Sequence, residues 1–579
     1  MLGGLLRESP RGEFFATRTV PTIIDEWIEN PTNMKNTNTQ NELQERIAEL
    51  EAEISILKQQ KKFGLVWEDK LEYVVTQCET HVPVLSEVKS KKISDTVQAN
   101  ENILIEGDNY HALSVLNYTH SKKIDVIYID PPYNTGGDFI YNDKYIDKDD
   151  SFRHSKWISF MHKRLVIARR LLSENGLIFI SIDDNEHATL KLLCDEVFSE
   201  FNFLGTITWE KRTKAQNTTT AKRMLQSKTE YVLAYRNSDK KVEFDLESAG
   251  NHEYTEEDKS GLYRLQKVEE MSAKGMRGRK TMSYSILGVS PRNEYQWKLG
   301  KEKIQFFLDR DDVEIVSDTP YLKIRPHDES SERFLPFWSH FFDKEGAGTA
   351  ERGKKELSKV LGHDNHNFET VKPVDLIKKI LFHANRDKTT YVLDFFAGSG
   401  TLAQAVLELN AEDGGNRRFI LCTNNENKIA EEVTYPRIKK VIKGYGNTTG
   451  LGGALRYYKT KLVDVEKLQK IPDEKRLQLT YQAGEMIALR EDIFEEQEKN
   501  EWWQIFATNE KTVAIYFQED KQKLRELVKK IAKTKQAVLY VFSWSKNEYT
   551  NEFSEYKHIR VEDIPEPIIE VYKEINRLK

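Results

Sequence analysis

The chain has 579 residues, of which 39% are hydrophobic and 31% charged, and its formal net charge is −6. No apolar run approaches the roughly 18–20 residues of a membrane span, and the N-terminus lacks the apolar stretch of a secretory signal. The three scattered cysteines have no metal-ligand spacing, so we expect a reducing cytoplasm with no disulfides and no metal. The net charge does not indicate a nucleic-acid partner, so such a partner would have to bind through local basic patches.

The first hundred residues contain one periodic segment. Residues 1–36 show no clear period and are expected to be a weakly ordered lead. Residues 37–100 are expected to be a helical or coiled-coil region, because five apolar residues are spaced alternately four and three apart. They are Leu43, Ile47, Leu50, Ile54 and Leu57. About two heptads fit a short coiled coil as well as an amphipathic helix that packs on its own domain.

Strands and helices alternate over residues 101–239. We expect strands at 103–108, 124–129, 177–182 and 231–235, with helices at 110–120, at 156–172 and from about 185 to 198. Glu174-Asn175-Gly176 has the composition of a C-cap for the second helix. Such alternation predicts an α/β fold with a doubly wound parallel sheet.

The alternation is lost over residues 240–365 and then returns. The interrupted stretch has basic and aromatic residues in loop-like context, as in KGMRGRKTMSYS, and is read as an insertion. Over 366–460 we expect helices at 374–384 and 401–409 and strands at 391–393 and 419–422. Residues 461–579 are expected to form a small α/β domain, with strands at 512–517 and 536–543 around a basic helix at 519–534.

DFFAGSGT (394–401) follows one of the expected strands. Gly398 and Gly400 have no Cβ, so a ligand can approach the backbone closely. The loop matches neither G-x-x-x-x-G-K-[ST] nor G-x-G-x-x-G, and no such phosphate loop occurs in the chain. Asp394 offers a carboxylate to a cation, which favours a small ligand with an amino group over a pyrophosphate. The alternative is a tight glycine turn that serves packing only.

DPPYNTG (130–136) follows another expected strand, where ligands of open α/β sheets bind. Pro131 and Pro132 fix φ and remove two N–H donors, which leaves the carbonyls of the turn as acceptors. A carboxylate from Asp130 and the ring of Tyr133 complete a pocket for an aromatic amine, such as an adenine flipped out of its stack. The alternative is a proline-rich surface turn.

DPPYNTG followed much later by DFFAGSGT resembles the S-adenosylmethionine-dependent DNA adenine-N6 methyltransferases of the β class, in which the catalytic loop precedes the cofactor loop. KKFGLVWE (61–68), LIEGDNYHAL (104–113) and the C-terminal region are similar to the modification subunit of type III restriction–modification systems. The resemblance covers the chain from about residue 40, and it implies a Rossmann-like methyltransferase sheet with an inserted target-recognition domain.

The resemblance also implies site residues. The catalytic motif would be Asp130, Pro131, Pro132 and Tyr133. The cofactor S-adenosyl-L-methionine would be held by Asp108, Asn134, Thr370, Lys372, Asp394, Phe396, Ala397, Gly398, Ser399, Gly400, Thr401 and Glu426. The chain departs from the pattern after strand 419–422, where Thr423 replaces the usual acid, so the ribose ligand stays open between Asn424 and Glu426.

The expected substrate is duplex DNA, read by the insertion through Lys274, Arg277, Arg279, Lys280 and Arg292. The resemblance implies a homodimer and a separate ATP-dependent restriction subunit. Since this chain has no Walker lysine, translocation must come from such a partner or be absent. Alternatives are methylation of cytosine N4, RNA or a protein amide, a DNA-recognition module with a dead catalytic site, and an orphan methyltransferase without a nuclease partner.

Overall fold

The structure is a computed structural model. It describes residues 65, 67–94, 101–135, 152–214, 222, 225–330, 332–366, 368–384, 387–543, 549, 553 and 555–576. The expected lead at 1–36 and the seam at 43–57 lie outside the described residues and stay predictions. None of the described helices has the length and apolar character needed to cross a membrane.

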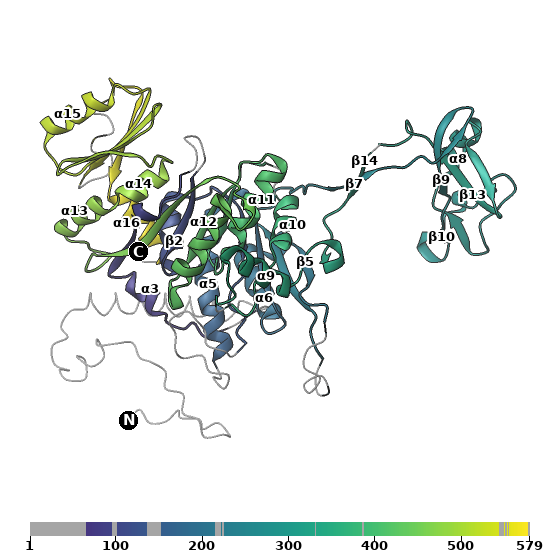
Figure 1. Ribbon diagram of the computed structural model, residues 1–579, viewed down its shortest axis with the longest axis horizontal. Coiled ribbons are helices and arrows are strands. Elements are labelled where there is room, and N and C mark those ends of the chain that lie inside the picture. The colour runs from purple at the N-terminus through teal and green to yellow at the C-terminus, as the bar shows by residue number, and fades with distance from the viewer. Residues whose placement is uncertain are drawn as a thin grey trace, which may run out of the picture. The chain divides into compact units, whose positions relative to one another are not determined.

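A 10-stranded mixed sheet forms the centre of the fold (Figure 1). In spatial order its strands are β1 (His81–Glu87), β20 (Ala454–Asp464), β2 (Glu101–Glu106), β17 (Arg418–Thr423), β16 (Tyr391–Asp394), β3 (Ile124–Ile129), β4 (Leu172–Ile182), β6 (Thr229–Arg236), β5 (Phe203–Glu210) and β15 (His340–Phe341). The strands from β20 to β4 run parallel. Antiparallel pairing adds β1 at one side and β6 at the other, so the expected parallel sheet is its central part.

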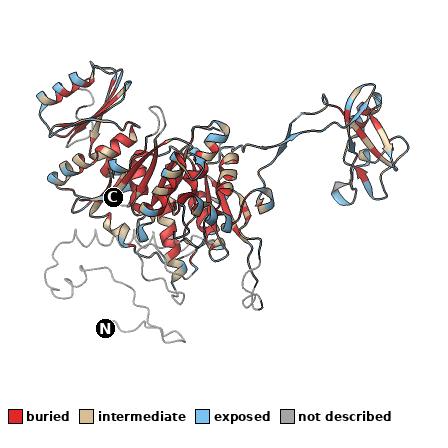
Figure 2. Cartoon of the chain, viewed as in Figure 1, coloured by how far each residue is buried: buried red, intermediate tan, exposed pale blue. Residues whose placement is uncertain are grey.

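Helices cover both faces of this sheet. One face packs against α4 (Asn109–Thr119), α5 (Arg153–Leu171) and α6 (His187–Phe198), and the other against α10 (Val374–Ala384), α11 (Thr401–Asp413) and α12 (Tyr435–Lys443). Strand β3 shows why: Ile127 and Ile129 belong to the first apolar cluster, whereas Val126 and Tyr128 belong to the second. Burial on both faces explains the near-continuous apolar strands of the sequence (Figure 2).

The expected helix cap at 174–176 is wrong. Helix α5 ends at Leu171, and Leu172 already has extended dihedrals, with φ −62° and ψ 134°. Strand β4 therefore begins at Leu172. Asn237 holds this extended segment, since its Nδ2 donates to the carbonyls of Leu172 (3.2 Å) and Ser173 (3.0 Å). A tertiary contact thus overrides the local turn composition.

The insertion contains strands and a helix that were not predicted, whereas KGMRGRKTMSYS lies in short 3-10 turns and coil, as its loop-like context indicates. Antiparallel strands β7 (Glu247–Asn251) and β14 (Glu332–Leu335) lead into the insertion. Between them lie β8 (Glu256–Asp258), β9 (Gly261–Lys267), β13 (Thr319–Ile324) and β12 (Val313–Val316) in one sheet, the pair β10 (Glu270–Ser272) and β11 (Tyr295–Trp297), and α8 (Lys301–Asp309). The insertion has its own apolar core, which includes Trp297 and Phe307. Its longer strands lack the continuous apolar runs of the central sheet, since β9 (GLYRLQK) and β13 (TPYLKI) contain charged residues and are only partly buried.

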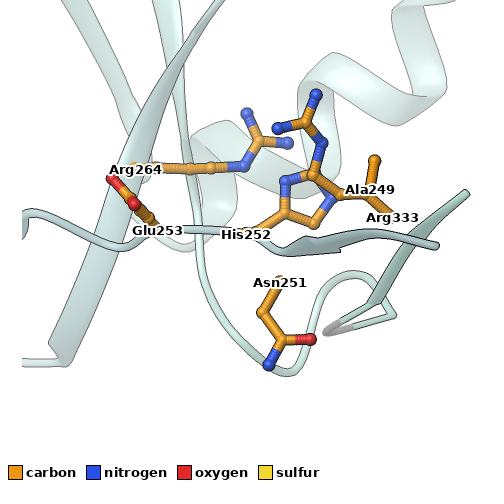
Figure 3. Close-up of a pocket in the computed structure, with 6 residues that line it drawn as sticks. All are labelled: Ala249, Asn251, His252, Glu253, Arg264 and Arg333. Atoms are coloured by element: carbon orange, nitrogen blue, oxygen red, sulfur yellow. The ribbon is translucent and has the colours of Figure 1, made fainter. Parts of the chain in front are cut away.

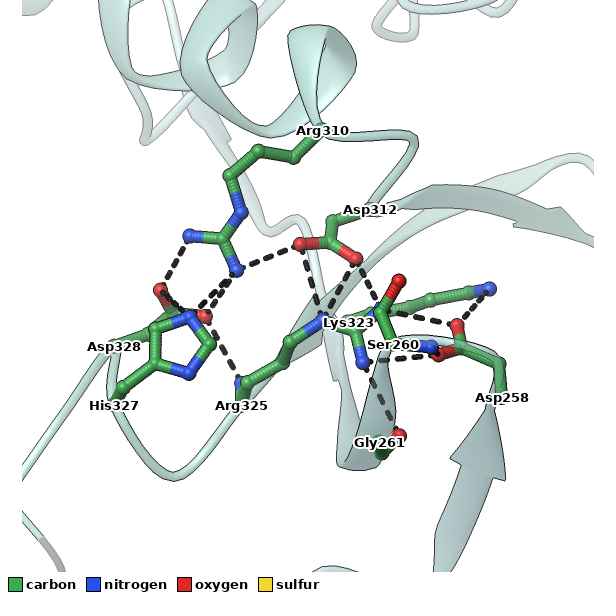
Figure 4. A network of polar contacts seen from close by, with 9 residues as sticks. All are labelled: Asp258, Ser260, Gly261, Arg310, Asp312, Lys323, Arg325, His327 and Asp328. Atoms are coloured by element: carbon green, nitrogen blue, oxygen red, sulfur yellow. Dashed lines mark hydrogen bonds and ion pairs between the residues drawn. The ribbon is translucent and has the colours of Figure 1, made fainter.

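A network of charged side chains ties these strands together (Figure 4). The side chain of Arg325 is only 4% exposed, and its guanidinium contacts Asp312 at 2.6 Å and Asp258 at 2.9 Å. Arg310 joins Asp312 (2.7 Å) to Asp328 (2.5 Å). Hydrogen bonds from Arg325 and then from Lys323 hold the pKa of Asp258 below its usual value. The insertion is therefore locked by ion pairs as well as by its core.

The C-terminal region forms a 5-stranded sheet of β21 (Glu496–Lys499), β22 (Trp503–Ala507), β23 (Lys511–Tyr516), β24 (Gln536–Phe542) and β25 (Ile559–Ile564). The expected strands at 512–517 and 536–543 are β23 and β24, and the expected basic helix is α15 (Lys521–Ile531). Helices α13 (Asp473–Gln482), α14 (Gly484–Arg490) and α16 (Glu566–Ile575) complete the region. Tyr572 of α16 donates from its hydroxyl to the Pro83 carbonyl of β1 (2.6 Å), which joins this region to the central sheet.

Candidate active site

The two loops singled out in the sequence follow neighbouring strands. Strand β3 leads into Asp130 and β16 ends at Asp394; the strands pair in parallel, with Val126 opposite Val392 and Ile127 opposite Leu393. Parallel strands present their carboxyl ends at one edge of a sheet. The two loops therefore meet at that edge although they are far apart in the chain.

The carboxylate of Asp130 lies in a compact polar cluster. The Lys372 ammonium donates to both Asp130 oxygens at 2.9 Å and to the Tyr133 hydroxyl at 2.8 Å. The Tyr133 hydroxyl donates to Asp130 Oδ1 at 2.7 Å. Glu230 of β6 completes the cluster, with its Oε2 3.2 Å from Lys372 Nζ. Two carboxylates therefore pair with one lysine at the turn of residues 130–133, the expected catalytic motif, which is called the catalytic corner below.

The charges in this cluster shift one another's protonation. Burial lowers the pKa of Lys372, but the carboxylates of Asp130 and Glu230 outweigh it and raise that pKa above its ordinary value. Burial raises the pKa of Glu230, but Lys372 and Lys211 outweigh it and lower that pKa. Burial, with the nearby carboxylates, raises the pKa of the Tyr133 phenol. Lys372 is thus a cation at neutral pH, and Tyr133 is a neutral hydroxyl.

A hydrogen bond from helix α5 holds the turn that contains Pro131 and Pro132. Trp157 of α5 donates from its indole Nε1 to the Pro132 carbonyl at 2.7 Å. This carbonyl is therefore not an open acceptor, contrary to the expectation that the turn leaves its carbonyls free. Among the described residues no hydrogen bond to the Pro131 carbonyl is found. Asn134 has left-handed dihedrals (φ 55°) and donates from Nδ2 to Glu186 at 2.6 Å.

The glycine loop after β16 is fixed by α11 and α12. Gly398 and Gly400 have φ of 47° and 77°, which glycine adopts without strain. Thr434 donates from Oγ1 to the Gly398 carbonyl at 2.6 Å. The buried Arg437 donates to Thr401 Oγ1 at 2.8 Å and also reaches Ser399; burial lowers the pKa of its guanidinium to about 10. Ala397 donates its N–H to the Cys422 carbonyl at 3.1 Å.

Asp394 is the buried acid of this loop. Its Oδ1 accepts the N–H of Phe396 at 2.9 Å, and Asp394 itself is 4% exposed. Burial raises the pKa of the Asp394 carboxyl well above its usual value; the bond from Phe396 opposes this shift and the nearby Asp130 adds to it. No ion pair of Asp394 is found among the described residues.

Asp108 lies next to the same loop. It caps α4, accepting the N–H of Tyr110 at 2.7 Å. The following residue, Asn109, donates from Nδ2 to the Phe395 carbonyl at 3.2 Å. The residue before it, Gly107, donates to the Thr423 carbonyl at 2.9 Å. The ends of β2, β16 and β17 are thereby held together around one position.

The polar groups at the ends of β2, β16 and β17 fit S-adenosylmethionine. A buried carboxyl with a raised pKa and no described cationic partner suits the ammonium group of an amino acid. Glycine φ values in the left-handed region allow a backbone cradle. A second carboxylate, Asp108, is 20% exposed; its Oδ1 lies 3.7 Å from the guanidinium of Arg164.

The catalytic corner opens into a pocket of about 1230 Å³. Its lining includes all four residues of the catalytic motif together with Thr370, Lys372 and Glu230. Thr370 and Lys372 were expected at the cofactor, but the structure places the Lys372 ammonium on the catalytic acid. Thr423 is buried, and Glu426 begins the turn Glu426–Lys428 outside this lining. The ribose ligand stays a prediction.

Two of the basic residues expected to bind DNA are paired with acids. Lys274 forms an ion pair with Glu294 at 2.6 Å, and Arg292 forms one with Glu270 at 2.5 Å. Arg279 and Lys280 are exposed, and the side chain of Arg277 is not described.

A pocket of about 480 Å³ lies beside the ribbon of β7 and β14, where Arg264, Arg333 and His252 converge (Figure 3). Arg264 is neutralised there by Glu329 at 2.6 Å. The basic surface of the insertion is therefore weaker than its sequence indicates.

Sequence reasoning missed several residues of the site. Glu230 and Lys211 belong to β6 and to the segment after β5, and no motif marks them. Trp157 was read only as a helix residue, and no element was predicted around Arg437. A signal was present for Arg437, because a charged residue on the apolar face of an amphipathic helix needs a buried partner.

Comparison with known proteins identifies the family. A family model described as DNA methylase matches residues 124–433, which is more than half of the chain. The Type III restriction-modification enzyme StyLTI Mod subunit of Salmonella typhimurium is 33% identical over 385 residues, which cover 59% of this chain and 56% of that protein. For the EcoPI Mod subunit of Escherichia phage P1 the identity is 32%, with coverages of 62% and 65%.

The Type II methyltransferase M.KpnI of Klebsiella pneumoniae is 32% identical, with 60% of this chain and 85% of that protein covered. The chain thus spans 56% and 65% of the two Mod relatives, and most of M.KpnI. These matches confirm the resemblance to DNA amino-methyltransferases that use S-adenosylmethionine. Because the family model covers more than half of its residues, and the matched segment contains both the Asp130 corner and the Asp394 loop, this chain belongs to the DNA methylase family.

Proposed function

We propose that this chain transfers a methyl group from S-adenosylmethionine to N6 of an adenine flipped out of duplex DNA. The observation that carries the proposal is the placement of the Asp130 corner and the Asp394 loop on neighbouring parallel strands. An acceptor site for an aromatic amine then lies beside a buried acid and a glycine cradle. The similarity to two Mod subunits and to M.KpnI supports it.

The catalytic corner would act on the amine. Adenine N6 is a weak nucleophile because its lone pair is delocalised into the ring. Asp130 and the Pro131 carbonyl would each accept one N–H and favour a pyramidal nitrogen, an effect of about 10²- to 10⁴-fold for general base assistance. Tyr133 would stack on the base for about 1–3 kcal/mol.

Lys372 lies beside the position that the amine would take. Its ammonium donates to both oxygens of Asp130; among the described contacts Oδ2 accepts no other bond, so it keeps a lone pair for an entering N–H. Glu230 also pairs with the lysine, 3.2 Å from Nζ. The nitrogen loses one proton after methylation, and a carboxylate oxygen of Asp130 is the base placed to receive it.

The cofactor would lie between Asp108, Asp394 and the glycine loop. When bound, S-adenosylmethionine supplies a methyl group carried by a sulfonium. Asp394 would pair with its ammonium, and Gly398 and Gly400 would let the backbone approach it. Thr434 and Arg437 hold the loop in place through the Gly398 carbonyl and Thr401.

The target base is inferred from the first residue of the catalytic motif. By resemblance to the family, Asp at this position is usual for adenine in DNA, whereas Ser would point to cytosine N4. Methylation of cytosine N4 is the alternative, and mass spectrometry of nucleosides from methylated DNA separates the two products.

We further propose that the chain is a type III modification and specificity subunit that acts in the bacterial cytoplasm. Both Mod relatives support this. By this reading the chain forms a homodimer and associates with an ATP-dependent restriction subunit. An orphan methyltransferase is the alternative, which the reading frame beside its gene would distinguish.

The test is single-molecule sequencing of DNA from cells that express the chain. We expect N6-methyladenine at one defined sequence, and none in cells expressing Asp130→Ala. That variant should retain its affinity for S-adenosylmethionine, since Asp130 lies outside the glycine loop. Methylation at the wild-type level by Asp130→Ala would overturn the assignment of the catalytic acid.

A further inference from the structure

A second cavity lies directly beside the catalytic pocket. Its volume is about 690 Å³, and it shares Glu431, Pro436 and Lys440 with the lining of the catalytic pocket. Four lysines line it, three of them on α12 and one on the turn Lys89–Lys91. They are Lys91, Lys439, Lys440 and Lys443.

The charge of this cavity is strongly positive. Glu431 is the one acid in its described lining, and it is already shared between Lys91 (2.9 Å) and Lys459 (3.2 Å). Lys440 donates to the Leu361 carbonyl (2.6 Å), which carries no compensating charge. The positive charge of the α12 lysines is therefore not neutralised by the described acids of the lining.

The helix dipole explains only part of the clustering of lysines in this cavity. Lysine in the last turn of a helix is favoured by the helix dipole, which accounts for Lys440 and Lys443 of α12. Lys91, which comes from another part of the chain, is held there by its ion pair with Glu431 (2.9 Å). Lys439 and Lys443 are both exposed and four residues apart, a spacing at which like charges destabilise a helix. A cavity that collects cations at such a cost suits an anionic ligand.

The neighbouring pocket indicates which anion. The catalytic pocket is itself acidic, with Asp130, Asp183, Glu230 and Glu369 in its lining. A nucleic acid whose base enters it must bring phosphates past these carboxylates, so the attraction has to come from beside the pocket. The lysines of α12 lie there, whereas Lys274 and Arg292 of the insertion are paired with acids.

We propose that this lysine cavity binds backbone phosphates of duplex DNA next to the flipped base. The inference rests on the proposed function, because it takes DNA as the substrate. Lysine ammoniums bind phosphates without reading sequence. The cavity would therefore set the position of the duplex over the catalytic corner and leave sequence recognition to other residues.

The salt dependence of DNA binding tests the proposal. A fluorescent duplex of arbitrary sequence is titrated with wild type and with Lys439→Ala/Lys443→Ala at several salt concentrations. Each lost phosphate contact lowers the slope of log K against log salt by about 0.9. We expect the slope to fall by about one to two units, and the KM for unmethylated phage DNA to rise. The affinity for S-adenosylmethionine, measured without DNA, should match the wild type.

Two matched variants make the result specific. Lys439→Arg/Lys443→Arg keeps both charges and should keep the wild-type slope. Lys529→Ala/Lys533→Ala removes two exposed lysines four residues apart at α15 and should also keep it. An unchanged slope in the α12 alanine variant, or an equal fall in the α15 variant, would overturn the proposal.

The same data separate this proposal from the proposed function. If the protein methylates DNA but the salt dependence of its DNA binding does not change when the α12 lysines are replaced, the proposed function stands and the phosphate-binding role of the cavity is rejected. If the protein binds DNA through these lysines but methylates no DNA, the phosphate-binding role of the cavity stands and the proposed function is rejected.

Discussion

Lys372 is the residue on which the electrostatics of the catalytic corner depend. Its ammonium contacts Asp130 at 2.9 Å and Glu230 at 3.2 Å, and it lowers the pKa of Glu230 against the opposing effect of burial. A lowered pKa means that the interaction of Glu230 with its lysines is present above the unfolded pKa. It is lost as the pH falls through the folded value.

Removing this lysine should shift the pH dependence of activity. In Lys372→Met the two carboxylates lose their shared cation, so the pKa of Glu230 rises. An opposite charge within about 4–6 Å is worth roughly one to three pKa units. We therefore expect the acidic limb of the kcat/KM profile to move to higher pH by about that amount. Lys378→Met is the matched control, since Lys378 is also a part-buried lysine with two glutamate partners. A profile that does not move would contradict this role.

Asp394 gives a second prediction at this scale. Its pKa is raised in the protein without cofactor, and a bound ammonium group would lower it. Binding of S-adenosylmethionine should therefore release protons and strengthen as the pH rises. Calorimetry in buffers of different ionisation enthalpy measures that release.

Asp394→Asn should abolish the proton release and weaken binding. A hydrogen bond to a charged group is worth about 1.5–3 kcal/mol, or roughly 10- to 100-fold in affinity. Proton uptake by the wild type, or an unchanged affinity of the variant, would show that Asp394 does not meet the ammonium.

The glycine loop before α11 determines function at the scale of the element. Gly400 has φ 77°, and a Cβ there would lie 3.1 Å from Thr434 Cγ2. Gly414 at the other end of α11 has φ 68° with nothing within 4 Å. The left-handed conformation costs a non-glycine residue about 1–2 kcal/mol, so alanine at either position should lower the free energy of unfolding by that amount.

Only Gly400→Ala should also weaken cofactor binding, because it moves the loop against α12. The measurements are thermal unfolding and S-adenosylmethionine affinity for both variants. Equal affinities in the two variants would show that the loop carries no ligand.

The insertion gives a prediction about its ion-pair network. Arg325→Met leaves Asp312, whose side chain is 1% exposed, without its closest cation. Asp312 keeps Arg310 at 2.7 Å, so the loss is smaller than the about 3–5 kcal/mol of a buried charge left without a partner. Hydrogen exchange should therefore accelerate over residues 256–328 and not in the central sheet. Lys303→Met on α8 is the control, since Lys303 is exposed. Unchanged exchange in Arg325→Met would contradict the role of the network.

At the scale of the whole molecule, we propose that cofactor binding and target recognition belong to separate parts of the chain. The insertion begins and ends on one ribbon, in which Asn251 pairs with Glu332. Replacing residues 252–331 by Asn-Gly would close this ribbon with a two-residue turn. We expect the shortened protein to bind S-adenosylmethionine with wild-type affinity and to lose site-specific methylation. Methylation of the same sites would place recognition elsewhere.

Much of the site was accessible from the sequence. The strand before DPPY and the strand before DFFAGSGT were predictable because both are short apolar runs buried on two sides. Their adjacency followed from the rule that parallel strands carry their sites at one end. The helix at 374–384 was predictable for a similar reason, since its apolar residues follow the helical period.

Only the tertiary structure decided the rest. The partnership of Lys372 with Asp130 and Glu230 joins three segments, and no local pattern encodes which charged groups meet in space. Strands β9 and β13 of the insertion were missed although they are as long as β2 and β3, because they contain charged residues and lack a continuous apolar run. The sequence by itself determined which chemical groups stand at the strand ends. The packed sheet decided which of these groups form ion pairs with one another, because Coulomb interactions depend on distance in space and not on separation along the chain.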